Sequence, residues 1–169
     1  MTVRELDTAP ADQARELLTA CCGASPWVDA MLAARPFGDR ERLFDAADRS
    51  WAGLSDAQLH DAIGRHPRLG ASRAKAALSA REQAWSAGEQ SGAALADDSA
   101  RAALAVANEA YELRFGHTFI LCATGLGPGD MLASLRQRLA NDDETERAIT
   151  ARELHKITRL RLEKLLAGA

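Results

Sequence analysis

Residues 143–166 read DETERAITARELHKITRLRLEKLL, and their apolar side chains recur every three to four positions. A rotation of about 100° per residue places Leu154, Ile157 and Leu165 on one stripe of a helix. Arg161 falls within the same stripe. This pattern is typical of a helix that buries one face. The stretch therefore predicts a long C-terminal helix with an arginine inside its apolar seam.

The same periodicity runs through most of the chain, whereas alternation of apolar and polar residues is scarce. We therefore expect an all-α protein, a single-domain bundle of about eight helices over residues 1–169. The expected helices are Asp12–Cys22, Trp27–Ala34, Asp39–Ala52, Ser55–Arg65, Ser72–Gly88, Asp98–Phe115, Pro128–Ala140 and Asp143–Leu166.

Local start and stop signals support several of these boundaries. Ser55 with Gln58 three residues later fits a capping box, and Pro128 fits a first helical position. Residues 88–97 form one of the expected breaks between helices. The run Phe119–Ala123 fits either a short extended piece or a buried helical turn, because periodicity does not separate the two in so short a run.

Composition narrows the functional classes. The formal net charge is -3, which argues against a nucleic-acid surface and favours a small molecule or another protein as partner. No apolar run approaches the roughly 18 to 20 residues of a membrane helix, and the N-terminus has no signal-peptide core. Three cysteines, two of them adjacent, do not make a disulfide framework. We expect a soluble protein of a reducing cytoplasm, and the richness in Ala, Arg and Leu points to a bacterial source.

His66 is the first candidate for chemistry. Pro67 disfavours helical geometry at the residue before it, so the preceding helix should end at His66. A histidine at a helix end is a potential acid or base, and it can equally well cap helix carbonyls. The functional interpretation therefore requires a partner.

A second candidate lies at the end of the helix expected over residues 72–88. Ser86, Glu89 and Gln90 stand at i, i+3 and i+4 and would project from one side. The alternative is a solvated helix end closed by Gly88. The Glu82-Gln83 pair one turn earlier is similar, so a Glu-Gln pair alone discriminates nothing.

Arg161 is the third candidate. A guanidinium within an apolar seam needs an anion or several acceptors, because a buried unpaired charge is costly. The alternative is an aliphatic stem that lies on the core with its head group in water. Arg159 projects with Arg152 and Glu163 toward the polar side of the helix, where we expect it to be solvated.

The sequence lacks the motifs of three other common kinds of site: a metal site, a phosphate-binding loop and a nucleophile elbow. The four histidines are widely separated, and there is no HExxH, His-x-His or CxxC spacing for a metal. Gly125–Gly129 lacks the lysine and hydroxyl residue of a phosphate-binding loop. A GxSxG nucleophile elbow is also absent.

Five blocks in series resemble one family, the 2-oxo-4-hydroxy-4-carboxy-5-ureidoimidazoline (OHCU) decarboxylases. The order and spacing of the blocks agree with the family, whose fold is all-helical. The blocks are Arg35-Pro-Phe37, His66-Pro-Arg-Leu-Gly70, Ser86-x-x-Glu89-Gln90-x-Gly92, Asn108-x-x-Tyr111-Glu112-x-x-Phe115-Gly116-x-x-Phe119-Ile120 and Lys156-Ile-Thr-Arg-Leu-Arg-Leu162.

The resemblance implies a cofactor-independent carboxy-lyase of purine breakdown that converts OHCU into (S)-allantoin. It implies that His66 and Glu89 form the catalytic pair, without a metal. The substrate contacts that it implies are Pro67, Ser86, Gln90, Phe119, Leu121 and Arg161. Arg159 lies in the same block as Arg161, and the helical-face argument favours Arg161.

The resemblance further implies a homodimer, with urate oxidase and hydroxyisourate hydrolase as metabolic neighbours. Two other functions stay open at this point. One is a related lyase acting on another ureido or imidazole acid, and the other is a non-catalytic helical scaffold for dimerisation.

Overall fold

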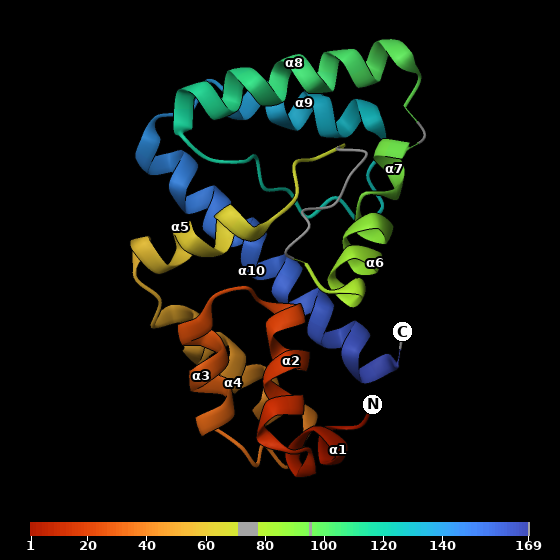
Figure 1. Cartoon of the computed structure of the whole chain (residues 1–169). Coiled ribbons are helices and arrows are strands. Elements are labelled where there is room, and N and C mark those ends of the chain that lie inside the picture. The colour runs from red at the N-terminus through yellow and green to blue at the C-terminus, as the bar shows by residue number, and fades with distance from the viewer. Residues whose placement is uncertain (71–77, 95, 169) are drawn as a thin grey trace. The chain divides into compact units, whose positions relative to one another are not determined.

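The computed structural model describes residues 1–70, 78–94 and 96–168, and every regular element in these ranges is a helix. The ten helices are α1 (Val3–Thr8), α2 (Ala11–Cys21), α3 (Ser25–Ala33), α4 (Arg40–Ala52), α5 (Asp56–Arg65), α6 (Ala80–Glu89), α7 (Ser91–Ala94), α8 (Asp98–Phe115), α9 (Pro128–Arg138) and α10 (Asp143–Ala167) (Figure 1). The all-α prediction is confirmed.

The chain divides into two compact units. Unit 1 comprises residues 1–62 and 155–169, and unit 2 comprises residues 63–154, so α5 and α10 contribute to both. The single domain expected over residues 1–169 stays a prediction. Within the described ranges, no helix combines the length and the apolar character needed to cross a membrane.

Capping residues set most helix starts. Ser55 and Gln58 form the predicted capping box of α5, and Pro128 occupies the predicted first turn of α9. Helix α1 was not expected. It starts at a capping box in which the Thr2 hydroxyl accepts from Glu5 N and the Glu5 carboxylate accepts from Thr2 N.

The helix expected over Ser72–Gly88 corresponds to α6, which ends one residue later than expected. Leu78 and Ser79 precede the helix, and the expected part over residues 72–77 lies outside the described residues. Helix α6 starts at Ala80, because Ser79 and Glu82 form a capping box. Gly88 does not close the helix, which continues to Glu89. The short helix α7 lies inside the expected 88–97 break.

In unit 1, α3 packs between α2 and α4. Trp27 is fully buried, and its indole N–H donates to Ala47 O at 3.1 Å, which ties α3 to α4. The loop after α3 is tied to the end of α1. Arg35 donates to Asp7 O at 2.7 Å, and the Asp7 carboxylate accepts from Phe37 N at 2.8 Å. These contacts give the Arg35-Pro-Phe37 block a structural role.

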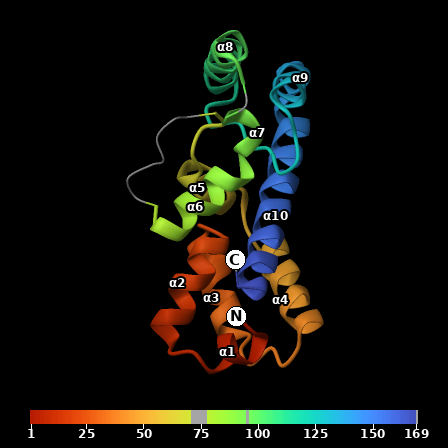
Figure 2. The same cartoon turned by 90° about the vertical axis from the view of Figure 1, so that its right-hand side faces the viewer.

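In unit 2, α8 and α9 lie side by side and run in the same direction (Figures 1 and 2). The 18 residues of α8 span ~27 Å, so the chain between the two helices has to return over a comparable length. Extended backbone covers ~3.3 Å per residue, more than twice the rise of a helix. This topology explains why Phe119–Ala123 forms no helical turn.

The apolar core of unit 2 joins residues from five parts of the chain: the loop after α5, helices α7, α8 and α9, and the segment between α8 and α9. Its buried members are Leu69, Ala93, Leu104, Ala107, Tyr111, Phe119, Ala123, Met131 and Leu135, and Leu121 packs against them. Fully burying a side chain of the size of Leu or Met stabilises a fold by about 1.5–3 kcal/mol. This core therefore holds together the loop after α5, helix α7 and the segment between α8 and α9, residues 116–127, which we call the return segment.

Candidate active site

His66 lies directly after the last residue of α5, as predicted from Pro67. Its backbone N–H donates to Ile63 O at 3.0 Å, which closes the last turn. The side chain is only 9% exposed, and its Nε2 atom is shielded from solvent. A buried imidazole at a helix end has the restricted orientation that acid–base catalysis requires.

The loop after His66 is clamped by side chains of α8. The guanidinium of Arg68 donates to both oxygens of Glu112, at 2.9 and 2.6 Å. This bidentate hydrogen bonding raises the pKa of Arg68 above its usual value. The side-chain amide of Asn108 donates to Leu69 O at 3.1 Å. Two residues of the Asn108-to-Ile120 block thus position the histidine loop.

Helix α6 carries the second group of predicted site residues. Ser86 and Glu89 are each only 6% exposed, so the alternative of a solvated helix end is wrong for these two positions. Gln90 is the C-cap of α6 and is half-buried. Its Oε1 atom accepts the backbone N–H of Gly70 at 2.9 Å, which leaves the Nε2 group as the part suited to a substrate oxygen.

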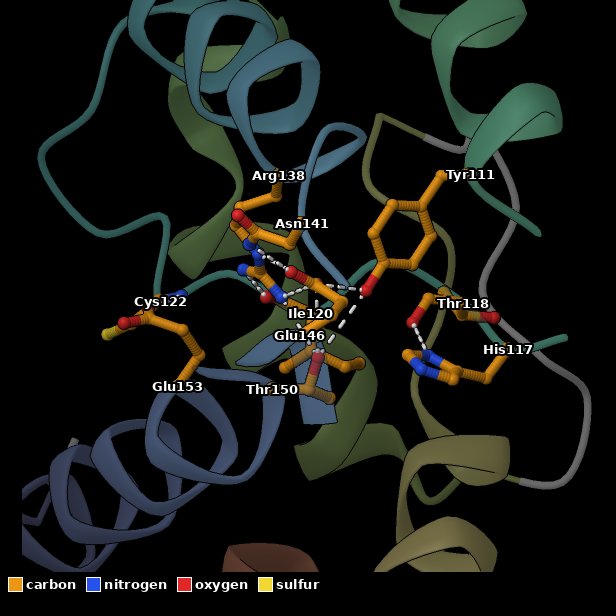
Figure 3. A network of polar contacts seen from close by, with 10 residues as sticks. All are labelled: Tyr111, His117, Thr118, Ile120, Cys122, Arg138, Asn141, Glu146, Thr150 and Glu153. Atoms are coloured by element: carbon orange, nitrogen blue, oxygen red, sulfur yellow. Dashed lines mark hydrogen bonds and ion pairs between the residues drawn. The ribbon is translucent and has the colours of Figure 1, made fainter. Parts of the chain in front are cut away.

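The return segment carries the remaining predicted contacts of unit 2. Phe119 is buried and Leu121 is half-buried, and neither lies in a helix or strand. The Ile120 carbonyl accepts from Arg138 at 2.7 Å, and the Cys122 N–H donates to Glu153 at 2.9 Å (Figure 3). Backbone groups outside regular structure can bind a ligand when other contacts fix them.

A buried ion pair between Arg138 and Glu146 lies behind this segment (Figure 3). Two guanidinium nitrogens of Arg138 donate to Glu146 Oε1, at 2.9 and 2.5 Å, and the Tyr111 hydroxyl donates to the same oxygen. Burial raises the pKa of Tyr111, and its hydrogen bond to Glu146 raises it further. Burial would also raise the pKa of Glu146, but hydrogen bonds from Arg138, Tyr111 and Asn141 outweigh it and lower that pKa.

Sequence reasoning did not identify this ion pair. One signal was present, because Glu146, Thr150 and Leu154 follow one another at intervals of four residues. The buried stripe of α10 therefore continues two turns toward the N-terminus, and both polar residues are 1% exposed. Arg138 carries a comparable signal, because Met131, Leu135 and Arg138 stand at i, i+4 and i+7 and form the buried stripe of α9.

Arg161 lies in unit 1, whereas the other seven predicted site residues lie in unit 2. It is 5% exposed, as its place in the stripe predicted, and Nη1 lies 3.4 Å from Ala20 O. Arg159 lies on the polar side of α10 as expected, with its side chain 40% exposed, and it also has an ion-pair partner. Arg159 binds both oxygens of Asp48 at 2.6 Å and lies over the Phe44 ring, because α4 supplies a carboxylate and an aromatic face there.

Within the described residues, no three or more His, Cys, Asp or Glu side chains are grouped as metal ligands. The predicted site residues of unit 2 offer an imidazole, a carboxylate, a hydroxyl, an amide and backbone groups. These groups can accept and donate protons and can bind a polar, planar molecule.

Comparison with known proteins gives consistent matches. The OHCU decarboxylase family model matches residues 7–163. The uric acid degradation bifunctional protein TTL of Arabidopsis thaliana is 32% identical over 148 residues, which are 87% of this chain and 45% of that protein. The 2-oxo-4-hydroxy-4-carboxy-5-ureidoimidazoline decarboxylase of Amia calva is 31% identical over 142 residues, 81% of this chain and 78% of that protein.

A solved structure of OHCU decarboxylase in the presence of (S)-allantoin has the same fold. It matches with a TM-score of 0.75 and 29% identity, over 90% of this chain and 98% of that chain. The chain spans less than half the length of the Arabidopsis relative, which is a bifunctional protein, and most of the length of the Amia relative.

Proposed function

Because the chain belongs to the OHCU decarboxylase family, we propose that it is a carboxy-lyase that converts OHCU into (S)-allantoin and carbon dioxide. The observation that carries the proposal is the family match over residues 7–163, which includes the His66 loop, α6 and the return segment. The matched structure in the presence of (S)-allantoin supports the same product class. The reaction would belong to the urate degradation branch of purine metabolism.

The conjugated system of the substrate can accept the electron pair that decarboxylation releases. Its carboxylate is attached to a carbon that bears a hydroxyl and adjoins a carbonyl and an imine-like nitrogen. When the carbon–carbon bond breaks and carbon dioxide leaves, the electron pair passes into this conjugated system. The protein then has to bind the anion and deliver one proton to a single face of the planar intermediate. We therefore expect catalysis without a cofactor.

His66 and Glu89 are the proposed acid–base pair. Both side chains are buried, so each is held in a restricted orientation, as general acid–base catalysis requires. Glu89 would orient or charge the imidazole. The two groups would take the hydroxyl proton and return a proton to carbon, which fixes the S configuration.

Six further residues are the proposed substrate-binding groups. The Nε2 group of Gln90 and the Ser86 hydroxyl would bind carbonyl or ureido oxygens. Pro67 and the segment from Phe119 to Leu121 would shape the pocket, partly through backbone groups. Arg161 is the proposed partner for substrate oxygens among the residues of unit 1, because it is the buried arginine in the apolar stripe of α10.

We further propose a homodimer in a reducing cytoplasm. The compartment is supported by the absence of a disulfide among the described residues, where Cys21, Cys22 and Cys122 are thiols. Urate oxidase and hydroxyisourate hydrolase are the proposed metabolic neighbours, because their reactions supply the substrate. Light scattering after size-exclusion chromatography tests the dimer.

A circular-dichroism time course tests the function. OHCU is generated from urate by urate oxidase and hydroxyisourate hydrolase, with and without the purified protein, and the assay is repeated with EDTA. We expect rapid appearance of the (S)-allantoin signal in both buffers. Slow racemic decay in the presence of folded protein would contradict the proposal and favour a related lyase or a helical scaffold. Loss of activity in EDTA alone would contradict cofactor independence.

A further inference from the structure

The return segment is held at two points, one on each side of Leu121. Before it, the Ile120 carbonyl accepts from Arg138 Nη1 at 2.7 Å. After it, the Cys122 N–H donates to Glu153 at 2.9 Å. Figure 3 labels the four residues of these contacts. Arg138 comes from α9, the next helix in the chain, and Glu153 comes from α10. The backbone around Leu121 is therefore fixed by side chains rather than by helical or strand hydrogen bonds.

Arg138 makes the stronger of these two attachments. Its guanidinium also lies 4.5 Å from the centre of the Phe119 ring, so it contacts two consecutive residues of the segment. A guanidinium over an aromatic face is attracted by the ring quadrupole. Only an arginine presents donors in several fixed directions, and a lysine at this position would not reproduce them.

Glu146, Thr150 and Asn141 fix Arg138 in turn. Glu146 and Thr150 accept hydrogen bonds from the guanidinium, and Asn141 Nδ2 donates to Glu146 at 2.8 Å. The Arg138 and Glu146 side chains are 6% and 1% exposed. A buried ion pair is often no more stabilising than well-packed apolar residues, because both charges lose their hydration. The geometry that the pair imposes on Phe119 and Ile120 is therefore a better indication of its role than its stability.

We propose that Arg138 is a positioning residue that holds the backbone of Phe119–Leu121 in the arrangement that binds the substrate and selects the protonated face. The inference rests on the proposed function. Arg138 acts through Ile120 and Phe119 and touches no reacting atom in this proposal. Glu146 and Tyr111 serve to keep the guanidinium in one orientation.

The variant Arg138→Lys tests the proposal, with Arg136→Lys on the exposed side of the same helix as its control. The lysine keeps the charge beside Glu146 and removes the fixed fork of donors. We expect KM to rise roughly 3- to 30-fold, from loss of a charged hydrogen bond that orders the site. We also expect the enantiomeric excess of (S)-allantoin to fall, whereas the control leaves both quantities unchanged.

These readouts separate positioning from stability. A merely less stable variant has a smaller active fraction, which lowers the apparent kcat and leaves KM unchanged. Its enantiomeric excess also stays unchanged when enough enzyme is added for turnover to outrun the spontaneous racemic decay. That result would overturn the proposal. If Arg138→Lys does not fold, Glu153→Ala removes the half-buried second attachment, at Cys122, and should change KM and enantiomeric excess in the same direction.

Amide hydrogen exchange provides a readout that does not depend on activity. In Arg138→Lys we expect exchange in residues 119–123 to accelerate by about tenfold or more, while α8 exchanges as before. Unchanged exchange would overturn the positioning role whatever the enzyme's activity. Accelerated exchange in a protein whose wild type does not decarboxylate OHCU would instead refute the proposed function and leave the structural coupling intact.

Discussion

The backbone N–H of Gly70 donates to the Oε1 atom of Gln90 at 2.9 Å. One side chain at the end of α6 thereby holds the loop that begins at His66, while its amide Nε2 group is suited to bind substrate. The loop adopts a left-handed conformation at Gly70, with φ +74°, which a glycine tolerates without strain. The two roles of Gln90 can be separated by substitution.

We expect Gln90→Glu to fold with nearly wild-type stability, because a carboxylate oxygen still accepts from Gly70. Its KM should rise, since the donor is lost and a negative charge faces an anionic substrate. Gln90→Leu should lose about 1 kcal/mol of stability as well, from the missing hydrogen bond. Urea unfolding and steady-state kinetics measure the two effects. Equal destabilisation by both variants would contradict the acceptor role.

His66→Ala and Glu89→Gln should each lower kcat by about 100- to 10,000-fold, the usual range for loss of a general acid or base. His60→Ala, at an exposed position of α5, is the control and should retain activity. The circular-dichroism assay measures both rate and stereochemistry. Stereoselective turnover at the wild-type rate in His66→Ala would rule out the proposed pair.

The backbone at Leu126 approaches Gly92 so closely that only a glycine fits at this position. A Cβ atom at this position would collide with the backbone carbonyl of Leu126. We expect Gly92→Ala to destabilise the protein by about 1–3 kcal/mol, because backbone has to shift. Gly88→Ala is the matched control, since nothing lies within 4 Å of its Cβ and alanine is favoured inside a helix by about 1 kcal/mol. The Tm should fall in Gly92→Ala and rise in Gly88→Ala, as measured by thermal unfolding.

The Asp48 carboxylate predicts a pH-dependent contribution to stability. Burial would raise its pKa, but hydrogen bonds from Arg159 and His155 outweigh this and lower the pKa below 3.8. A lowered pKa stabilises the folded state above the unfolded value, and this stabilisation disappears as pH falls through the folded value. Urea unfolding should show wild type more stable than Asp48→Asn at pH 7, with the difference shrinking below about pH 4. A pH-independent difference would contradict this linkage.

The two arginines of α10 should behave differently. Arg161→Lys should raise KM by about tenfold or more, if its buried guanidinium binds substrate oxygens. Arg159→Lys should leave KM unchanged and lower stability modestly, because its partner is Asp48. Kinetics and thermal unfolding of the pair measure this contrast. A KM effect confined to Arg159→Lys would reverse the assignment.

Local patterns accounted for much of the fold. The capping box of Ser55 and the end of α5 at His66 follow from neighbours within four residues, and the structure confirms both. At the start of α6, a capping box outweighs the apolar periodicity. Ser79 with Glu82 starts α6, although the periodicity had suggested an earlier start.

The helical class, the helix end at His66 and the place of Arg161 in the apolar stripe follow from the amino-acid sequence, because each depends on a periodicity or a backbone restriction within a few residues. Only the folded chain shows that Arg159 binds Asp48, that Gly92 faces Leu126 and that Arg138 holds Ile120. The physical reason is that these contacts join residues 18 to 111 positions apart, or depend on the approach of another backbone, and no local pattern specifies which distant group meets a side chain.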